Sequence, residues 1–326
     1  MMKELAGKCT GCCKDLYCRD GFFEGEIDEG TAFCFPCSNQ LRSDFTEEEI
    51  GLFIARLNKN PAQHTGYCGT EEMEVTDTLL NDFSDLSFKN SFAVLKEDGK
   101  IIAALGADWD MEAASGELWG PFSLKDGEEW QEDAGRLWRF LKHKINHNGT
   151  WHGFYNEQNQ QAINWISLQG AVHKSKEVIL RVIPEEIKPG KQMEVEEFTA
   201  PYTEKFKSLH TSAFPAGYFS SDEILRRQNN HNRLFVVQEN QRLAGYVYVE
   251  ASPAHGEGSI EFITVNPNFR GQGVGEALLK RAAAFLFQEM NVKEISICVN
   301  AGNEAAIHLY KKVGFSEKHR LSFYKL

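Results

Sequence analysis

The stretch Ile260–Leu279, IEFITVNPNFRGQGVGEALL, decides how the C-terminal half of this 326-residue chain folds. An alternating apolar run ending at Val265 predicts a strand, the glycines after Arg270 predict a tight turn, and the apolar repeat from Glu276 predicts a helix. The first backbone N–H groups of such a helix have no helical partners and lie at the positive end of its dipole. Glycine leaves these groups uncovered and Arg270 adds a positive charge, so the stretch predicts a diphosphate site.

Two other phosphate-binding motifs do not fit this turn. A P-loop requires Gly-Lys followed by Ser or Thr, and a dinucleotide fingerprint requires glycines at its first, third and sixth positions. From Gly271 the sixth position is Glu276. The run from Val265 to Gly275 instead resembles the coenzyme A-binding motif of the GNAT superfamily of N-acetyltransferases. A second motif of that family follows at the expected distance, from Asn303 to Phe315 (NEAAIHLYKKVGF).

The resemblance implies a role for each residue of the two motifs. Backbone N–H groups of the turn would hold the pyrophosphate of acetyl-coenzyme A, main-chain groups of the strand would hold the pantetheine arm, and two side chains would contact the cofactor. The residues concerned are, in that order, Gln272, Gly273, Val274 and Gly275 with Gly271 before them, then Ile263 and Val265, then Arg270 and Asn303. The alternatives are core packing for the two strand residues and helix capping for the asparagine.

The resemblance also assigns Tyr310 as the acid that protonates the coenzyme A thiolate, with a partly buried core tyrosine as the alternative. An amine with a pKa near 10 must lose a proton before it can attack a thioester. Strand alternation predicts that Glu261 shares a face with Ile263 and Val265, which makes its carboxylate the candidate base, directly or through water. A cross-strand acid pair, a water chain, and the preceding residues Glu257 and His255 are the alternatives.

Cysteines are concentrated near the start of the chain, at positions 9, 12, 13, 18, 34 and 37. Cys9 and Cys12 form one C-x-x-C knuckle, and Cys34 and Cys37 form another, which predicts a structural zinc site with four thiolate ligands. Cys13 and Cys18 leave the ligand set open, and a redox-labile or disordered tail is the alternative. Fewer than 45 residues bury little core, so a metal would stabilise such a module. Of the remaining two cysteines, Cys298 is expected in the core.

The C-terminal pattern occurs a second time, earlier in the chain. The run from Asn156 to Gly170 aligns with Asn300 to Gly314 at one constant offset, which indicates tandem copies of one fold. At the phosphate turn, however, the first copy has Asp126-Gly-Glu-Glu-Trp-Gln131, and its carboxylates would repel a diphosphate. The first copy is therefore expected to bind no cofactor and to serve as a scaffold or as one wall of the acceptor pocket.

These observations predict an α/β (α+β) chain in which each of two GNAT-like domains is a mixed, mostly antiparallel twisted sheet flanked by helices, preceded by a small zinc-ribbon-like module. The expected boundaries are residues 1–45 for the module, 46–183 for the degenerate copy, 184–191 for a linker, and 192–326 for the N-acetyltransferase domain. The second copy is expected to end with a strand near Leu321–Lys325, and the first with a strand near Val178–Val182.

Composition narrows the classes of function. A net charge of −12 makes nonspecific nucleic-acid binding unlikely on physical grounds, because such binding neutralises phosphates with basic side chains. No apolar run is long enough to cross a membrane, and the first residues lack the apolar segment of a signal peptide, so a cytoplasmic, reducing setting is expected. Composition leaves a homo-oligomer open.

The leading hypothesis is an acyl-coenzyme A dependent N-acyltransferase, using acetyl-coenzyme A and transferring its acyl group directly to a small-molecule or peptide amine in a ternary complex. The alternative is a non-catalytic acyl-coenzyme A sensor whose zinc-stabilised module binds a partner. Both share the cofactor site, and they differ in what Tyr310 and the base do.

Overall fold

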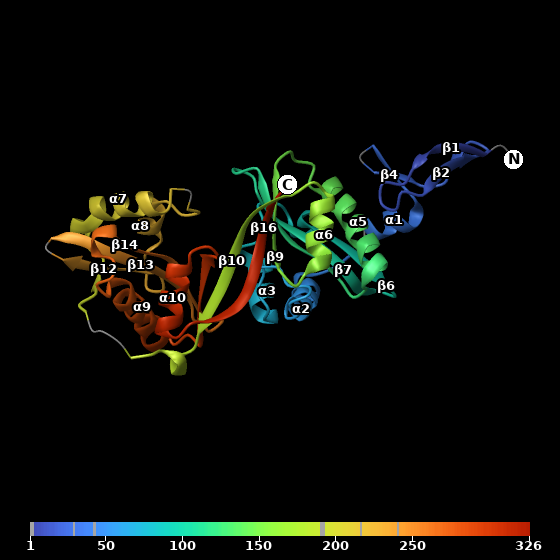
Figure 1. Cartoon of the computed structure of the whole chain (residues 1–326). Helices are drawn as coiled ribbons and strands as arrows, with labels where there is room; N and C mark the ends of the chain where they lie inside the picture. Colours follow the sequence, from blue (N-terminus) through green and yellow to red (C-terminus); the bar gives the residue numbers. More distant parts are fainter. Residues whose placement is uncertain (1–2, 29, 42–43, 190–192, 216, 240) are drawn as a thin grey trace. The chain divides into compact units, whose positions relative to one another are not determined.

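The computed structural model describes residues 3–28, 30–41, 44–189, 193–215, 217–239 and 241–326 (Figure 1). The chain divides into two compact units. Unit 1 comprises residues 1–175 together with 321–326, and unit 2 comprises residues 176–320. Each unit contains a mixed sheet with helices packed on both faces, as expected for two copies of one fold.

The N-terminal module of unit 1 is a set of short strands followed by one helix. Strands β1 to β3 form one small sheet, and β4 pairs with β5 in a hairpin. The bounds are β1 Lys3–Lys8, β2 Asp15–Arg19, β3 Phe22–Phe23, β4 Glu26–Asp28, β5 Thr31–Phe33 and α1 Phe35–Leu41.

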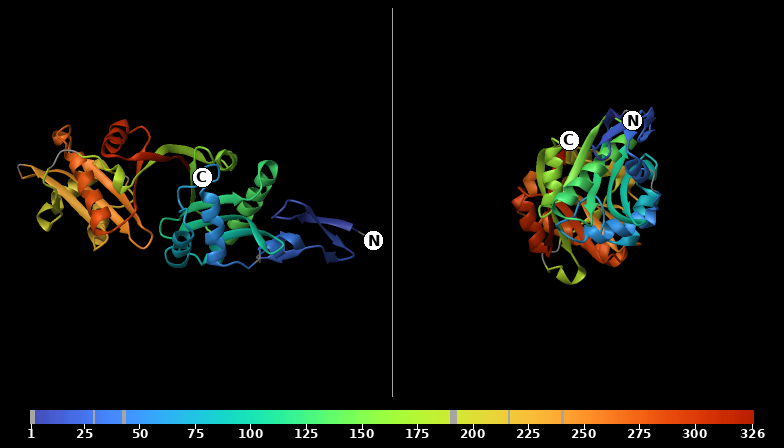
Figure 2. Two further views of the ribbon diagram at one scale, coloured as in Figure 1. Left: turned by 90° about the horizontal axis from the view of Figure 1, so that it is seen from below. Right: turned by 90° about the vertical axis from the view of Figure 1, so that its right-hand side faces the viewer.

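The rest of unit 1 is a five-stranded sheet with the order β16-β9-β8-β7-β6, antiparallel except for the β8–β9 pair. Helices α5 and α6 cover one face, while α2 and α3 cover the other (Figure 2). Thr46 and Glu49 form a capping box at the start of α2. The bounds are α2 Glu47–Asn58, α3 Glu72–Asn81, α4 Phe88–Ser91, β6 Phe92–Glu97, β7 Lys100–Asp110, β8 Ser115–Ser123, α5 Gly127–Lys144, β9 Thr150–Asn156 and α6 Gln160–Leu168.

Unit 2 repeats this plan in a six-stranded sheet with the order β11-β12-β13-β14-β15-β10, in which only β14 and β15 run parallel. Helix α9 covers one face, and α7 and α8 cover the other. The bounds are β10 Val172–Val182, β11 Glu196–Glu197, α7 Thr203–Ala213, α8 Ser221–Arg227, β12 Arg233–Glu239, β13 Arg242–Ser252, β14 Glu257–Val265, α9 Val274–Ala284, β15 Glu294–Asn300, α10 Glu304–Val313 and β16 Ser316–Lys325. Three short 3₁₀ turns and a π turn after α9 complete it.

Two strands belong to different sheets from those that their positions in the sequence predict. Residues 177–182 of β10 pair with β15 in unit 2, and residues 321–325 of β16 pair with β9 in unit 1. The unit boundaries therefore fall at 175/176 and 320/321, and differ from the expected boundary between residues 183 and 192. In β10 the buried residues alternate, at Val178, Leu180 and Val182, whereas in β16 they are Leu321, Ser322 and Tyr324. In neither strand does the residue pattern determine the pairing partner.

The N-terminal module shares its core with the degenerate copy. Phe33 and Cys37 lie in the same buried cluster as Phe140 on α5. The Arg139 guanidinium, also on α5, donates from Nε and Nη2 to the Gly11 carbonyl at 2.9 and 2.7 Å. The module is therefore an integral part of unit 1.

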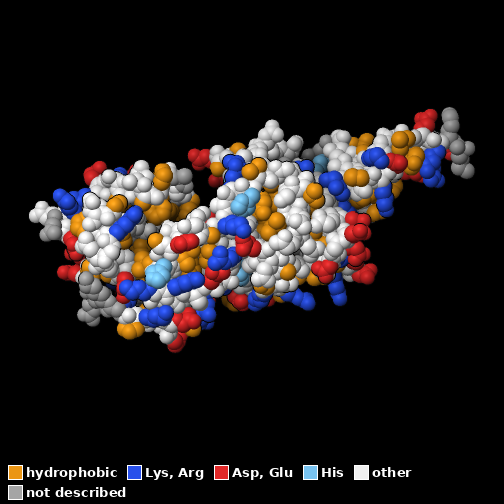
Figure 3. All heavy atoms as spheres, in the orientation of Figure 1, with side chains coloured by type: hydrophobic (Ala, Val, Ile, Leu, Met, Phe, Trp, Pro, Cys, Tyr) orange, Lys and Arg blue, Asp and Glu red, His pale blue; other side chains and the backbone are white. Residues whose placement is uncertain are grey.

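The surface is chemically mixed. Acidic, basic and apolar side chains are interspersed over the face that Figure 3 shows, in keeping with the modest negative charge of the chain. In the part of the chain that the structure describes, every helix is too short or too polar to span a lipid bilayer.

Candidate functional site

Strand β14 opens away from its parallel neighbour. Only residues 257–259 pair with β15, whereas pairing with β13 continues to Val265. The amide of Asn266 donates to the Ala244 carbonyl at 2.9 Å, so alternation directs the main-chain groups of Ile263 and Val265 away from β13, toward the edge that β15 leaves unpaired. These two residues therefore lie on the segment of β14 that β15 leaves unpaired, and their side chains also pack against the core.

A β-bulge in β14 changes the setting of Glu261. The register passes from Tyr248 opposite Phe262 to Val249 opposite Ile260, which leaves Glu261 as the extra residue. Its carboxylate accepts a hydrogen bond from the Tyr218 hydroxyl, and the Tyr218 ring lies 4.7 Å from that of Phe262. The expected common face with Ile263 and Val265 is therefore wrong, because the bulge interrupts the simple alternation.

The other candidates for the base lie at the opposite end of β14. Glu257 is its first residue, and His255 lies in the turn before it, where Nδ1 is 2.9 Å from the Ser252 hydroxyl. Both are far along the strand from the opened edge at Val265. Glu261 is the candidate acid that shares the open segment.

The glycines of the turn have separate structural roles. Gly271 and Gly273 have φ values of +76° and +94°, a conformation that glycine adopts at little cost. A Cβ at Gly271 would meet no atom within 4 Å, whereas one at Gly275 would lie 2.8 Å from Leu309 Cδ2. Gly271 and Gly273 therefore shape the turn, and Gly275 allows α9 to pack closely on α10.

Helix α9 begins at the end of this turn, with Gly273 as its N-cap. The first amide bonded along the helix is that of Ala277, which donates to the Gly273 carbonyl at 3.0 Å. The preceding first-turn amides, including those of Val274 and Gly275, have no partner within the helix and are suited to bind an anion. Arg270 is exposed beside them, with Nε 3.4 Å from the Val265 carbonyl.

Tyr310 lies on α10, and Asn303 is the residue immediately before that helix. Tyr310 is 5% exposed, and burial raises the pKa of its hydroxyl, so it stays protonated at neutral pH and remains a potential proton donor. The Asn303 side chain accepts from the Ala306 amide at 3.2 Å and caps the helix. Capping does not exclude a cofactor contact.

Two features of the site were missed or misplaced by sequence reasoning. Tyr218 lies in the weakly patterned segment between α7 and α8, where an aromatic residue next to glycine was the only signal. Cys298 is exposed on β15, and the expectation that it lies in the core is wrong. On β15 the alternate residues Ile297 and Val299 face the core instead.

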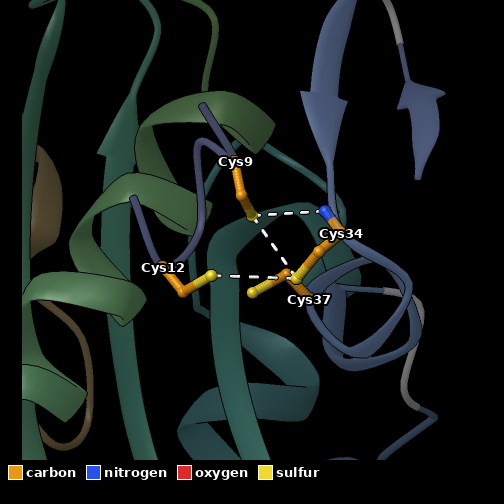
Figure 4. A group of neighbouring side chains, drawn as sticks. All are labelled: Cys9, Cys12, Cys34 and Cys37. Atoms are coloured by element: carbon orange, nitrogen blue, oxygen red, sulfur yellow. Dashed lines mark hydrogen bonds between the residues drawn. The ribbon is translucent and has the colours of Figure 1, made fainter. Parts of the chain in front are cut away.

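Four cysteines come together in the N-terminal module. The sulfurs of Cys9, Cys12, Cys34 and Cys37 all lie within 4.8 Å of one another (Figure 4). Cys34 Sγ is 3.6 Å from Cys9 Sγ and 3.7 Å from Cys12 Sγ. Four sulfurs bound to one zinc ion at about 2.3 Å would stand about 3.8 Å apart, so the two knuckles fit tetrahedral zinc. Within the described residues Cys13 and Cys18 lie outside this group.

The corresponding turn of unit 1 is closed by its own side chains. The Gly127 amide, which aligns with that of Gly271, donates to Gln161 Oε1 at 3.0 Å. Glu128 and Glu129 occupy the first turn of α5. The edge of β9 that β8 leaves unpaired is filled by residues 64–66, since the Gly66 amide donates to the Phe154 carbonyl at 2.7 Å.

A buried asparagine holds that filling segment in place. Asn58 donates to the carbonyls of Thr65 and Cys68 at 3.2 and 2.7 Å and accepts from the Thr65 amide at 2.8 Å. The Tyr155 hydroxyl donates to the Gly120 carbonyl at 3.0 Å, within the same opening between β8 and β9. In unit 1 the opening between β8 and β9 is thus occupied by residues 64–66 and by the Tyr155 hydroxyl, and the Gly127 amide of the turn is already bonded.

Comparison with known proteins agrees with this geometry. The model of the acetyltransferase (GNAT) family matches residues 203–315, which include the opened strand, the phosphate turn and α10. This part of the chain belongs to the GNAT acetyltransferase family. Spermidine N(1)-acetyltransferase of Vibrio cholerae is 32% identical over 115 residues, 33% of this chain and 66% of that enzyme. Mycothiol acetyltransferase of Propionibacterium freudenreichii is 34% identical over 85 residues, 26% of this chain and 27% of that enzyme.

The part of each relative that aligns with this chain is therefore at most about two thirds of the relative's length, and it is 48% of the spermidine N(1)-acetyltransferase of Escherichia coli K12. Solved structures resemble a larger part of the fold. A GCN5-related N-acetyltransferase from Sphaerobacter thermophilus covers 86% of this chain and 92% of its own, with a TM-score of 0.67 and 15% identity. A tandem GNAT protein from the clavulanic acid pathway covers 88% and 96%, with a TM-score of 0.58 and 13% identity. The tandem mixed α/β architecture is thus confirmed.

Proposed function

We propose that unit 2 is an acyl-coenzyme A dependent N-acyltransferase that uses acetyl-coenzyme A. The observation that carries this proposal is the opened edge of β14 at Ile263 and Val265, followed directly by the N-terminus of α9. An extended pantetheine arm can add to the free strand edge through main-chain hydrogen bonds, as peptides add to sheet edges. The first-turn amides of α9 and the charge of Arg270 are suited to the pyrophosphate.

The reaction assigns one group to each step. The acceptor ammonium gives a proton to the Glu261 carboxylate, directly or through water, and its nitrogen lone pair then attacks the thioester carbonyl carbon. A main-chain N–H on the free edge of β14 stabilises the oxygen as it becomes negative. The C–N bond forms, the C–S bond breaks, and the departing thiolate takes a proton from the Tyr310 hydroxyl. The second proton that the nitrogen loses as it becomes an amide returns through water to the Tyr310 oxygen.

The acceptor is proposed to be a primary amine on a small molecule or a peptide. Two relatives are named for spermidine and mycothiol, which supports amine acylation in general. The exposed Glu261–Tyr218 pair offers a carboxylate that can accept hydrogen bonds from an ammonium group.

The two remaining parts of the chain are proposed to have structural roles. The closed turn and filled strand edge support a unit 1 that binds no acetyl-coenzyme A. Cys9, Cys12, Cys34 and Cys37 would hold a zinc ion, which would stabilise a module too small to fold on its own core.

Isothermal titration with acetyl-coenzyme A tests the cofactor site. The double substitution Arg270→Asp with Gln272→Glu gives the turn of unit 2 two of the three carboxylates of the unit 1 turn and leaves every glycine in place. We expect binding of one equivalent by the unmodified protein and at least tenfold weaker binding by the variant. The reciprocal variant, Asp126→Arg with Glu128→Gln, is the matched control and should gain no second binding event, because Gln161 still occupies the Gly127 amide.

Thiol release in the presence of a panel of amines and peptides tests the transfer step. Release that depends on both acetyl-coenzyme A and an amine supports the enzyme. Tight binding without release for any amine would favour the alternative of a non-catalytic sensor.

A further inference from the structure

The loop between α7 and α8 places one tyrosine against the catalytic strand. The Tyr218 hydroxyl donates to Glu261 Oε2 and lies 3.3 Å from the main-chain oxygen of the same residue. Although the side chain is 66% exposed, its hydroxyl thus reaches both polar groups of the bulge residue. Among the described residues Tyr218 is the sole hydrogen-bond partner of the Glu261 carboxylate.

Aromatic contacts hold this tyrosine in place. Its ring centroid lies 4.7 Å from that of Phe262 and 4.8 Å from that of Phe219. Gly217 lets the loop approach the strand, because a Cβ there would lie 3.2 Å from Phe262 Cε1. A side chain stacked in this manner has little rotational freedom, so the direction of its hydroxyl is fixed before any acceptor binds.

The hydroxyl acts as a donor in this pair. Desolvation of the hydroxyl where it meets Glu261, and then the charge of that residue, raise the pKa of Tyr218, so it keeps its proton throughout the neutral range although the ring is largely exposed. The charged and titratable groups facing the pair are Glu250, which the Arg227 guanidinium neutralises, and Cys298. The pKa of Cys298 is raised to about 12 by desolvation of its sulfur and by Glu177 and Glu261, although the residue as a whole is exposed. Of these acidic side chains, Glu261 is therefore the one whose carboxylate is bonded to Tyr218.

We propose that Tyr218 is a positioning residue that holds the Glu261 carboxylate in the orientation that receives the acceptor ammonium. This inference rests on the proposed acyltransfer. One carboxylate oxygen is bonded to the tyrosine, and the other stays available to the amine. A bulge residue has no cross-strand partner of its own to fix its side chain, so without this bond the carboxylate would rotate freely.

Tyr218→Phe tests the proposal, because it removes the hydroxyl and keeps the stacked ring. Tyr202→Phe is the matched control, since the Tyr202 hydroxyl bonds Glu196 at 3.1 Å in the same unit but on another strand. We expect Tyr218→Phe to leave the Kd for acetyl-coenzyme A within twofold and to reduce kcat/KM for the acceptor about tenfold. Tyr202→Phe should change neither property.

A measurement without turnover separates the two proposals. In protein labelled with carbon-13 at glutamate carboxyls and held at pH 7, the Glu261 resonance, assigned with Glu261→Gln, should change its chemical shift in Tyr218→Phe, because the carboxylate loses this hydrogen bond. An unchanged Glu261 resonance, or an unchanged kcat/KM, would overturn the role of Tyr218. Absence of turnover in the unmodified protein together with the changed resonance would overturn the acyltransferase and leave the Tyr218–Glu261 coupling intact.

Discussion

Removing the zinc proposed for the N-terminal module should destabilise all of unit 1, because the two share one core. Leu16, Phe33 and Leu41 are at most 9% exposed and stay buried only while the module is folded. Full burial of one such side chain contributes about 1.5–3 kcal/mol, so the three together contribute about 5–9 kcal/mol as an upper range. A typical domain is stable by only about 5–15 kcal/mol. We therefore expect the melting temperature of unit 1 to fall by at least about 10 °C.

Tryptophan fluorescence can follow this loss selectively. The six tryptophans of the chain all lie in unit 1, at positions 109, 119, 130, 138, 151 and 165. Their emission during a thermal scan, with and without chelator, reports unit 1, and calorimetry with acetyl-coenzyme A at low temperature reports unit 2. Cys37→Ser should reproduce the effect of the chelator.

Cys13→Ser is the matched control, because Cys13 is exposed and lies outside the four-sulfur group. It should melt like the unmodified protein and retain its zinc. Coincident tryptophan melting curves with and without chelator, in protein that had contained one zinc per chain, would refute the shared-core reasoning. Loss of acetyl-coenzyme A binding upon chelation would refute the expected independence of unit 2.

Three further perturbations probe the catalytic acid, an ion pair and the unit boundary. Tyr310→Phe should lower turnover about a hundredfold or more with little change in the Kd for acetyl-coenzyme A; steady-state kinetics with unchanged turnover would remove the acid role. Hydrogen bonds from Lys280 and Lys312, at 2.7 and 2.8 Å, lower the pKa of the buried Glu276 from 4.5 to about 2. The contribution of ionised Glu276 to the stability of the folded protein is therefore complete above about pH 4.5 and is lost as the pH falls through about 2. Glu276→Gln should cost about 1–2 kcal/mol at pH 7, since both lysines are partly solvated, and urea unfolding should show this difference vanish by about pH 2. A fragment of residues 176–320 should bind acetyl-coenzyme A. A fragment of residues 192–326 should aggregate, because it lacks β10 and so leaves the edge of β15 unpaired. Equal solubility of the two fragments in size-exclusion chromatography would contradict the assignment of β10 to unit 2.

Local features of the chain were predictable because short stretches determine them. The strand, turn and helix from Ile260 onward, the capping box at Thr46, and the order of the two GNAT motifs depend on neighbouring residues. The two C-x-x-C knuckles also gave the cysteines that come together, since a knuckle geometry is local and only the meeting of the two depends on the fold.

Features that depend on distant contacts were not predictable. The bulge at Glu261 arises from the register between β13 and β14. Strand alternation alone placed that carboxylate on the same face as Ile263 and Val265. Tyr218 reaches Glu261 across 43 positions of sequence. Cys298 lies on a strand with one open face, and an apolar run does not reveal which of its faces is covered.

The position of residues 321–325 in unit 1 has a consequence for biosynthesis. During translation β9 leaves the ribosome long before its partner strand β16 has been made. A nascent first unit would therefore display an unprotected strand edge while the whole of unit 2 is synthesised. Such an intermediate invites chaperone capture and misassociation between polysome neighbours, so expression at reduced temperature should raise the yield of active protein.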